Sequence, residues 1–136
     1  MLHRSGFTVI ELVVVLAIVA VLASIGIPNY VAMQNRAKDA AVLNSAHTVQ
    51  LAAEDYSVMH DGVYSDLAAD LVPLFPDALL LENPYTRQRT EPQFGWAATQ
   101  PGQVGISVVV QAGVNVGYLI TGFGREGLVV VTENHR

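Results

Sequence analysis

One acidic side chain stands inside the long apolar segment near the amino terminus. Glu11 lies four residues after Phe7, and the apolar segment that contains it continues to Ile27. An ionised carboxylate in an apolar environment is costly by itself and much less costly when a positive group pairs with it. An ionisable residue at membrane depth is therefore expected to be functional and to have a partner. Glu11 is the first residue for which the sequence demands a chemical role.

The partner that the sequence offers is an amino group. A leader, residues 1–6, ends in Gly6 before the apolar segment, whereas a secretory signal peptide has its small residues after a shorter apolar stretch. Cleavage between Gly6 and Phe7 would keep the apolar helix and expose an amine at Phe7, about one helical turn from Glu11. We predict that this amine on one subunit and Glu11 on its neighbour neutralise each other across a bundle of helices.

The segment that must position Glu11 is long enough to cross a membrane. As a helix at about 1.5 Å per residue, residues 7–27 reach about 31 Å, which matches a hydrocarbon core of about 30 Å. The segment contains 14 Phe, Val, Ile and Leu residues, which outweigh the insertion cost of one carboxylate. Arg4 in the leader favours a cytoplasmic amino end. The sequence therefore predicts a spanning helix over residues 7–28 and export of the remainder.

Several of these features together resemble the prepilin amino terminus of type IV pilins and type II secretion pseudopilins. They are the leader ending in Gly6, Phe7 as the new first residue, Glu11, and the Val/Leu/Ile run before Pro28. The resemblance implies that a prepilin peptidase cuts between Gly6 and Phe7 and methylates the Phe7 amine. It also implies that Glu11 guides docking and that the helix forms the core of a helical homopolymer. Around Pro28, it implies unwinding on assembly, whereas the residues alone equally allow a kink at the membrane exit.

The exported residues 29–136 predict one small α+β domain of ordinary size. Apolar residues recur every three or four positions over residues 30–60, which predicts an amphipathic helix with an alanine-rich packing face. A mainly irregular segment is predicted to follow over residues 61–93.

Local signals divide the rest of this domain. A short helix is predicted over residues 66–72 with Ser65 as its N-cap, and residues 77–92 have the pattern of a surface loop. A sheet is predicted over residues 94–133, where β-branched and aromatic residues alternate with other types. Its predicted strands are residues 94–99, 106–111, 116–121 and 128–132. Short connections favour an antiparallel meander of three to four strands against which the long helix packs, and the pilin ladle has the same architecture.

Cysteine is absent from the 136 residues, so no disulfide can fasten the C-terminal part of the chain. Packing, bound ions or neighbouring subunits must serve instead. Glu82, Asn83 and Glu91 carry oxygen atoms of the kind that calcium prefers, which makes them the candidate ligands for a calcium site. We favour a solvated loop over this calcium site and expect no other cofactor.

Other functions have weaker support. Residues 122–127 spell the G-x-G-x-x-G of a dinucleotide-binding turn, but the apolar strand pattern after them predicts a hairpin whose glycines adopt positive φ. The exported part is acidic, and we predict that Arg87, Arg89 and Arg125 form salt bridges rather than bind nucleic acid. The histidines lack metal-ligand spacing, and no serine stands in a nucleophilic motif. We therefore predict that the chain is not an enzyme.

The prediction for function is a structural filament subunit, with a major pilin as the first choice. Alternatives within the family are a pseudopilin of a type II secretion system and a minor pilin, and a membrane-anchored binding module is the alternative of another class. Expected partners are copies of the chain, the prepilin peptidase, the inner-membrane assembly platform and the membrane itself. The precursor is predicted to cross the inner membrane once, with its globular domain in the periplasm or outside the cell. The mature chain is predicted in a periplasmic or cell-surface filament.

Overall fold

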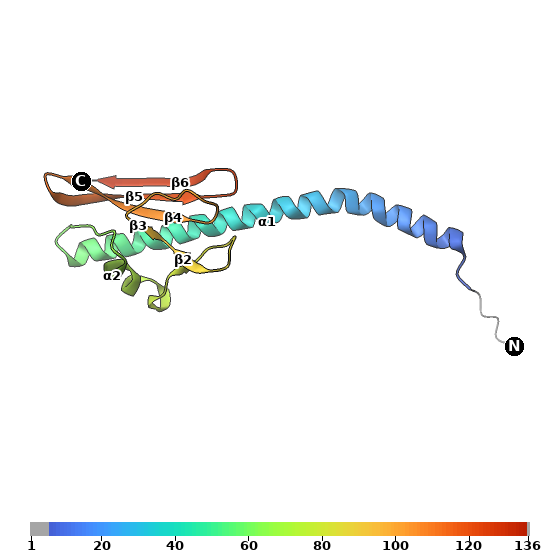
Figure 1. The fold of residues 1–136 in the computed structure, drawn as a ribbon, viewed down its shortest axis with the longest axis horizontal. Coiled ribbons are helices and arrows are strands. Elements are labelled where there is room, and N and C mark those ends of the chain that lie inside the picture. Colours follow the sequence, from blue (N-terminus) through green and yellow to red (C-terminus); the bar gives the residue numbers. More distant parts are fainter. Residues whose placement is uncertain (1–5, 136) are drawn as a thin grey trace. The chain divides into compact units, whose positions relative to one another are not determined.

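The computed structural model describes residues 6–135, which form two compact units (Figure 1). The first unit extends to Asn35 and the second begins at Arg36. Helix α1, Val9–Met59, contributes its first part to one unit and its last part to the other. Of the predicted leader, residues 1–5 lie outside the described residues.

The first unit is a helix with its apolar side chains exposed. Large hydrophobic side chains from Phe7 to Val31 lie on its surface, and α1 is the one helix among the described residues that is long and apolar enough to cross a membrane. Helical structure continues through Pro28, although proline cannot donate the backbone hydrogen bond of that turn. Unwinding around Pro28 on assembly stays a prediction, because the structure describes a single chain.

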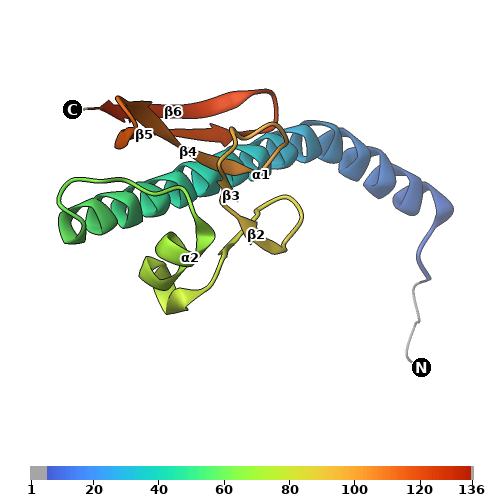
Figure 2. The same ribbon diagram turned by 60° about the vertical axis from the view of Figure 1, so that its left-hand side comes forward.

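The second unit places the last part of α1 on a four-stranded sheet, and this α+β architecture is the predicted one (Figure 2). The sheet has the order β3-β4-β5-β6, and β1 and β2 form a separate pair. After α1 the elements are α2 Ala68–Leu71, the 3-10 turns η1 Val72–Leu74 and η2 Pro76–Ala78, β1 Leu81–Glu82, β2 Arg89–Glu91, β3 Gln93–Phe94, β4 Val104–Gln111, β5 Val114–Phe123 and β6 Leu128–His135.

The core of this unit lies between one face of α1 and the sheet. The predicted helix stripe was Val42, Ala46, Val49, Ala53 and Tyr56. The first four are buried in one cluster with residues of β4 and β5, and Tyr56 is partly buried against that cluster. Alanines on this face let the helix lie close to the strands. A Cβ on Gly122 would stand 3.0 Å from Val42 Cγ1. Glycine at this point therefore permits the packing of helix on sheet.

The prediction of a purely antiparallel meander was wrong for the first strand of the sheet. β3 pairs with β4 in parallel, with Phe94 opposite Ile106, while β4–β5 and β5–β6 are antiparallel. The predicted strand over residues 94–99 ends early because Gly95, at φ 76°, turns the chain. The next residues cross over Gly105, where an added Cβ would lie 2.3 Å from the Trp96 carbonyl oxygen.

The segment between helix and sheet is more ordered than predicted. The predicted loop over residues 77–92 contains β1 and β2, which pair antiparallel, and it buries two polar side chains, Asn83 at 3% and Glu91 at 1% exposure. The short helix begins at Ala68 rather than residue 66, and its N-cap residue makes no side-chain cap bond. Ser65 Oγ instead accepts the Leu67 N–H at 3.1 Å.

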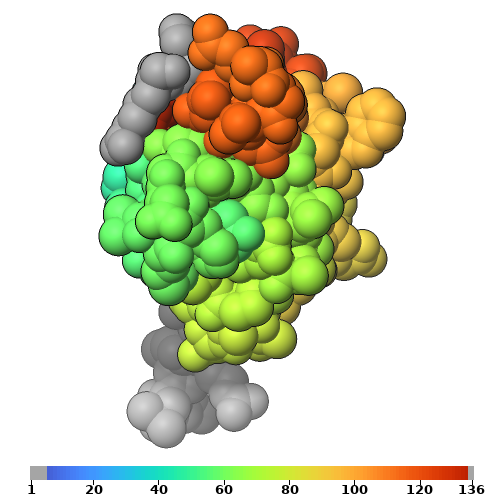
Figure 3. Space-filling view, turned by 90° about the vertical axis from the view of Figure 1, so that its left-hand side faces the viewer, coloured from blue at the N-terminus to red at the C-terminus, as the bar shows by residue number. Residues whose placement is uncertain are grey.

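Two hairpin ends close the unit. Residues 122–127 connect β5 to β6 as predicted, with the Gly124 N–H donating to Gly127 O at 2.7 Å. Gly122 and Gly124 are not at positive φ; each is required by a close approach, for example of Gly124 to Asp39. At the far end, the green turn after α1 lies beside the orange β4–β5 hairpin (Figure 3), where the Tyr64 N–H donates to Asn115 O at 3.1 Å.

Candidate assembly site

The carboxylate of Glu11 caps the helix that carries it. Thr8 donates to Glu11 Oε2 from its backbone N–H at 2.8 Å and from its hydroxyl at 2.7 Å. In return, the Glu11 N–H points to Thr8 Oγ1 at 3.3 Å. This reciprocal arrangement is a capping box, in which an N-cap Thr and a Glu three residues later satisfy backbone donors at the helix start. Sequence reasoning missed Thr8, although the T-x-x-E spacing before an apolar run was a visible signal.

The predicted cleavage point lies immediately before this cap. Residues 6–8 are not helical, and a Cβ added to Gly6 would meet nothing within 4 Å. Phe7 is 77% exposed. The peptide bond between Gly6 and Phe7 is therefore in an exposed, non-helical segment that a peptidase can reach.

A shallow hollow lies beside the Glu11 side chain. It has a volume of about 320 Å³ and is lined by Phe7, Ile10, Glu11, Val14 and Val15. All of these residues except Glu11 are apolar, so an apolar group can fit against them while a positive group reaches the carboxylate. The predicted site residues Phe7 and Glu11 are thus brought together at one place, and Pro28 is not part of it.

Comparison with known proteins supports this location. Residues 1–27 match the family model of the prokaryotic N-terminal methylation motif. The chain carries this methylation motif.

Two curated relatives are pilus proteins. Over 72 residues the chain is 42% identical to the type IV wide pilus major component PilA4 of Thermus thermophilus, covering 51% of this chain and 53% of the relative. Over 69 residues it is 36% identical to the type IV major pilin protein PilA of Myxococcus xanthus, covering 51% of this chain and 31% of the relative. The chain thus spans about half and about a third of the relatives that it matches. No solved structure gave a significant match.

The resemblance to type IV pilins is thus supported by the methylation motif and by these relatives. Neither relative is named as an enzyme. The position of the motif agrees with the geometry, because its 27 residues include the open Gly6–Phe7 bond, the Thr8–Glu11 cap and the exposed apolar helix.

The predicted calcium ligands form a different kind of site. Glu82 is exposed, whereas Asn83 Nδ2 donates to Glu91 Oε1 at 3.1 Å in the interior. Glu91 Oε2 accepts the Val104 N–H at 3.0 Å, and Asn83 Oδ1 accepts the Tyr85 N–H at 2.9 Å. These oxygens tie the β1–β2 segment to the sheet. No cluster of three or more His, Asp or Glu side chains suited to a metal occurs within residues 6–135, and calcium binding stays a prediction.

The C-terminal strand, which lacks a disulfide, is fastened by a polar network on α1. Glu54 Oε1 accepts hydrogen bonds from the Tyr118 hydroxyl and from Asn134 Nδ2, both at 2.8 Å. Glu54 Oε2 accepts the Tyr64 hydroxyl at 3.1 Å. Burial, together with the hydrogen bond to Glu54, raises the pKa of Tyr118 to about 12. Packing and this network hold the C-terminal strand in place without a disulfide.

A second carboxylate of α1 fastens the other end of the unit. Asp39 Oδ1 accepts the Tyr85 hydroxyl at 2.7 Å and the Arg125 backbone N–H at 3.0 Å. Burial and the contact with Asp39 raise the pKa of Tyr85 to about 12. Lys38 Nζ lies 4.9 Å from the centre of the Tyr85 ring. The arginines were predicted to form salt bridges. Arg89 Nη1 instead donates to the Leu80 carbonyl oxygen at 3.2 Å.

Proposed function

We propose that the chain is the major structural subunit of a type IV pilus-like filament, assembled from the inner membrane through its N-terminal helix. The methylation motif and the two relatives named as pilus components support this proposal. The apolar surface of α1 from Phe7 to Val31 is exposed in the isolated chain. Burying such a surface against a membrane, and later against other copies of the same helix, is favourable.

The observation that carries the proposal is the state of the Glu11 carboxylate. Both Thr8 donors go to Oε2, and Oε1 has no hydrogen-bond partner among the described residues. Capping the subunit's own helix thus uses one oxygen, and the other can accept the amine that cleavage frees at Phe7 of a neighbouring copy. A charge-assisted bond of this kind is stronger than a neutral one. One carboxylate can therefore cap within a subunit and dock between subunits.

The test separates the charge of Glu11 from its capping role. Gln at this position preserves a capping box but has no charge. We expect Glu11→Gln to insert in the membrane and retain its helix, while filament yield falls about tenfold or more because the neighbour's amine is left unpaired. Thr8→Val is the matched control, since it removes the hydroxyl that caps the helix and keeps the charge. Sheared filaments from cells expressing each variant, normalised to membrane-bound subunit, give the yield.

Two outcomes contradict the docking role. Normal filament yield from Glu11→Gln shows that the charge is dispensable. A larger loss from Thr8→Val than from Glu11→Gln shows that capping, and not charge, is what assembly needs.

Processing is tested separately on the mature chain. The proposal includes cleavage between Gly6 and Phe7 by a prepilin peptidase and methylation of the Phe7 amine. Mass spectrometry of the purified subunit should find N-methylated Phe7 at its amino terminus. Any other first residue overturns the prepilin interpretation.

A pseudopilin, a minor pilin and a membrane-anchored binding module are the alternatives. Electron microscopy of cells with and without the chain distinguishes them. Loss of abundant fibres indicates a major pilin, and loss of protein secretion with fibres retained indicates a pseudopilin. A minor pilin would change the number of fibres while contributing little mass to them. A binding module would leave both fibres and secretion unchanged.

A further inference from the structure

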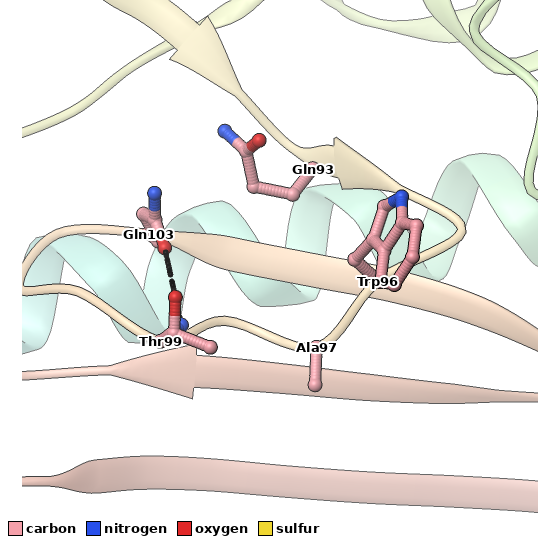
Figure 4. A pocket seen from close by; sticks show the side chains of 5 residues that line it. All are labelled: Gln93, Trp96, Ala97, Thr99 and Gln103. Carbon is pink, nitrogen blue, oxygen red and sulfur yellow. Dashed lines mark hydrogen bonds between the residues drawn. The ribbon is translucent and has the colours of Figure 1, made fainter.

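The sheet side of the second unit carries a hollow that neither the methylation motif nor filament assembly explains. It has a volume of about 260 Å³ and is lined by Gln93, Trp96, Ala97, Thr99 and Gln103 (Figure 4). Trp96, the sole tryptophan of the chain, is 76% exposed. An indole ring left in water next to a hollow is a place where a ligand can stack.

The segment that presents the indole is held firmly. Before Trp96, the Gly95 N–H donates to Ile106 O at 2.8 Å. After it, the Ala98 N–H donates to the buried hydroxyl of Thr121 at 2.7 Å. The chain between them lies directly against Gly105. A platform fixed before binding loses little conformational entropy when a ligand arrives.

Two amide groups supply hydrogen bonds with fixed polarity. Gln103 Oε1 accepts the N–H groups of Thr99 at 3.1 Å and Gln100 at 3.0 Å, so its Nε2 is the end that can donate to a ligand. Gln93 Nε2 donates to Thr90 O at 3.2 Å, so its Oε1 is the end that can accept. The Thr99 hydroxyl, joined to Gln103 by the dashed line in Figure 4, lies beside them.

These groups together select a class of ligand. The lining residues contain no charged side chain, which disfavours phosphates, nucleic acids and acidic polymers. A sugar ring has an apolar C–H face that stacks on an aromatic ring, and hydroxyl groups around its edge that both donate and accept hydrogen bonds. We propose that the Trp96 hollow binds one ring of a neutral saccharide, with the indole under the C–H face and the two glutamine amides at the hydroxyl edge.

The hollow is small for a ligand site, since sites for drug-sized molecules have volumes of about 300–1,000 Å³. One ring bound in an open hollow gives weak affinity for a single site. If subunits repeat along a filament, many such sites engage one polysaccharide and the avidity rises. Binding by the single subunit does not depend on assembly, so the saccharide proposal and the filament proposal can fail separately.

The experiment uses the only indole of the chain as its reporter. The full-length chain in detergent is titrated with chitotetraose, cellotetraose and maltotetraose as neutral probes, and with polygalacturonic acid as a charged comparison. A neutral saccharide should shift the Trp96 emission to shorter wavelength and protect it from acrylamide quenching. Trp96→Phe, measured by calorimetry, should retain part of the affinity, while Trp96→Ala should lose about tenfold or more.

Gln93→Ala removes one hydrogen-bonding group and should weaken binding with the fold intact. Val110→Ala, which removes an exposed side chain of β4 outside the hollow, is the matched control and should bind as the wild type does. If none of the three neutral saccharides changes the emission, the proposal is overturned. It is also overturned if Trp96 becomes protected on filament formation without sugar, because the hollow is then a contact between subunits.

Discussion

Replacing Glu54 should strongly destabilise the second unit. The hydroxyls of Tyr118 and Tyr64 and the amide of Asn134 all donate to its two oxygens. Both tyrosines are almost wholly buried, at 0% and 1% exposure. In Glu54→Leu these hydroxyls lose their acceptor, and a buried donor without a partner costs about 1–3 kcal/mol. For the two hydroxyls together we expect a loss of about 2–6 kcal/mol, a large share of the roughly 5–15 kcal/mol that stabilises a typical domain.

The assay must report on the second unit rather than on the apolar helix. Thermal unfolding of the full-length chain in detergent, followed by the near-ultraviolet circular dichroism of tyrosine, meets this requirement because Tyr64 and Tyr118 lie edge to face in the core at 5.2 Å. Tyr118→Phe removes one donor together with its need for an acceptor. The loss caused by Glu54→Leu should therefore be smaller in a Tyr118→Phe background.

The result that refutes this reasoning is additivity. If Glu54→Leu and Tyr118→Phe destabilise the chain by amounts that add within about 0.5 kcal/mol, the two groups are not coupled. A loss below about 1 kcal/mol for Glu54→Leu alone would show that water replaces the carboxylate at little cost.

Three further predictions concern the same unit. The pKa values of Tyr118 and Tyr85 are both raised to about 12 from the usual 10, so between pH 10 and pH 12 the unfolded chain releases protons that the folded chain keeps. Stability should be complete below pH 10 and fall as the pH rises to 12, by about 2 kcal/mol for the buried Tyr118 and by less for the partly exposed Tyr85. A flat profile in denaturant titrations would contradict this. Gly102→Ala should lower the melting temperature, because a Cβ on Gly102 would lie 2.0 Å from Asn83 Oδ1. Gly113→Ala should lower it less, because Gly113 has a comparable φ but open space around it. Equal effects would assign the loss to backbone strain alone. Chelation with EGTA should leave the melting temperature unchanged, because the carboxylate oxygens of Glu91 already accept hydrogen bonds from protein groups. A decrease in melting temperature that added calcium reverses would support the calcium site instead.

The sequence was sufficient for the features that depend on local pattern. The recurrence of apolar residues predicted the packing stripe of α1, and Val42, Ala46, Val49 and Ala53 are buried as expected. The antiparallel strands and the hairpin at residues 122–127 follow from alternation and glycine in the same way. Patterns of this kind extend over only a few residues, so predicting these elements required no knowledge of contacts between distant segments.

What the sequence did not predict depends on contacts between distant segments. Glu91 is separated from Val104 by 13 residues, and only the folded chain shows that its carboxylate is buried against that strand. In the sequence, Glu91 stands between Thr90 and Pro92, and such a polar, proline-containing stretch is typical of an exposed loop. The parallel pairing of β3 was missed because Gly95 acts as a turn only when its neighbours lie against Gly105. Thr8 is different, since its capping box with Glu11 was readable from spacing alone.

The two carboxylates that fasten the second unit both belong to α1. Asp39 and Glu54 are 15 residues apart, which places them about 22 Å from each other along the helix. One holds the segment around Tyr85 and the hairpin at Arg125, and the other holds β6 through Asn134. The helix therefore holds the Tyr85 segment, the Arg125 hairpin and β6. The role that a disulfide could have had is divided between two carboxylates on this helix. Because Glu11 lies in the first unit and both fastenings lie in the second, losing Glu54 should destabilise the second unit while the cap at Glu11 stays formed. Losing the charge of Glu11 should leave both fastenings intact, so folding and the proposed assembly are separable functions of a single helix.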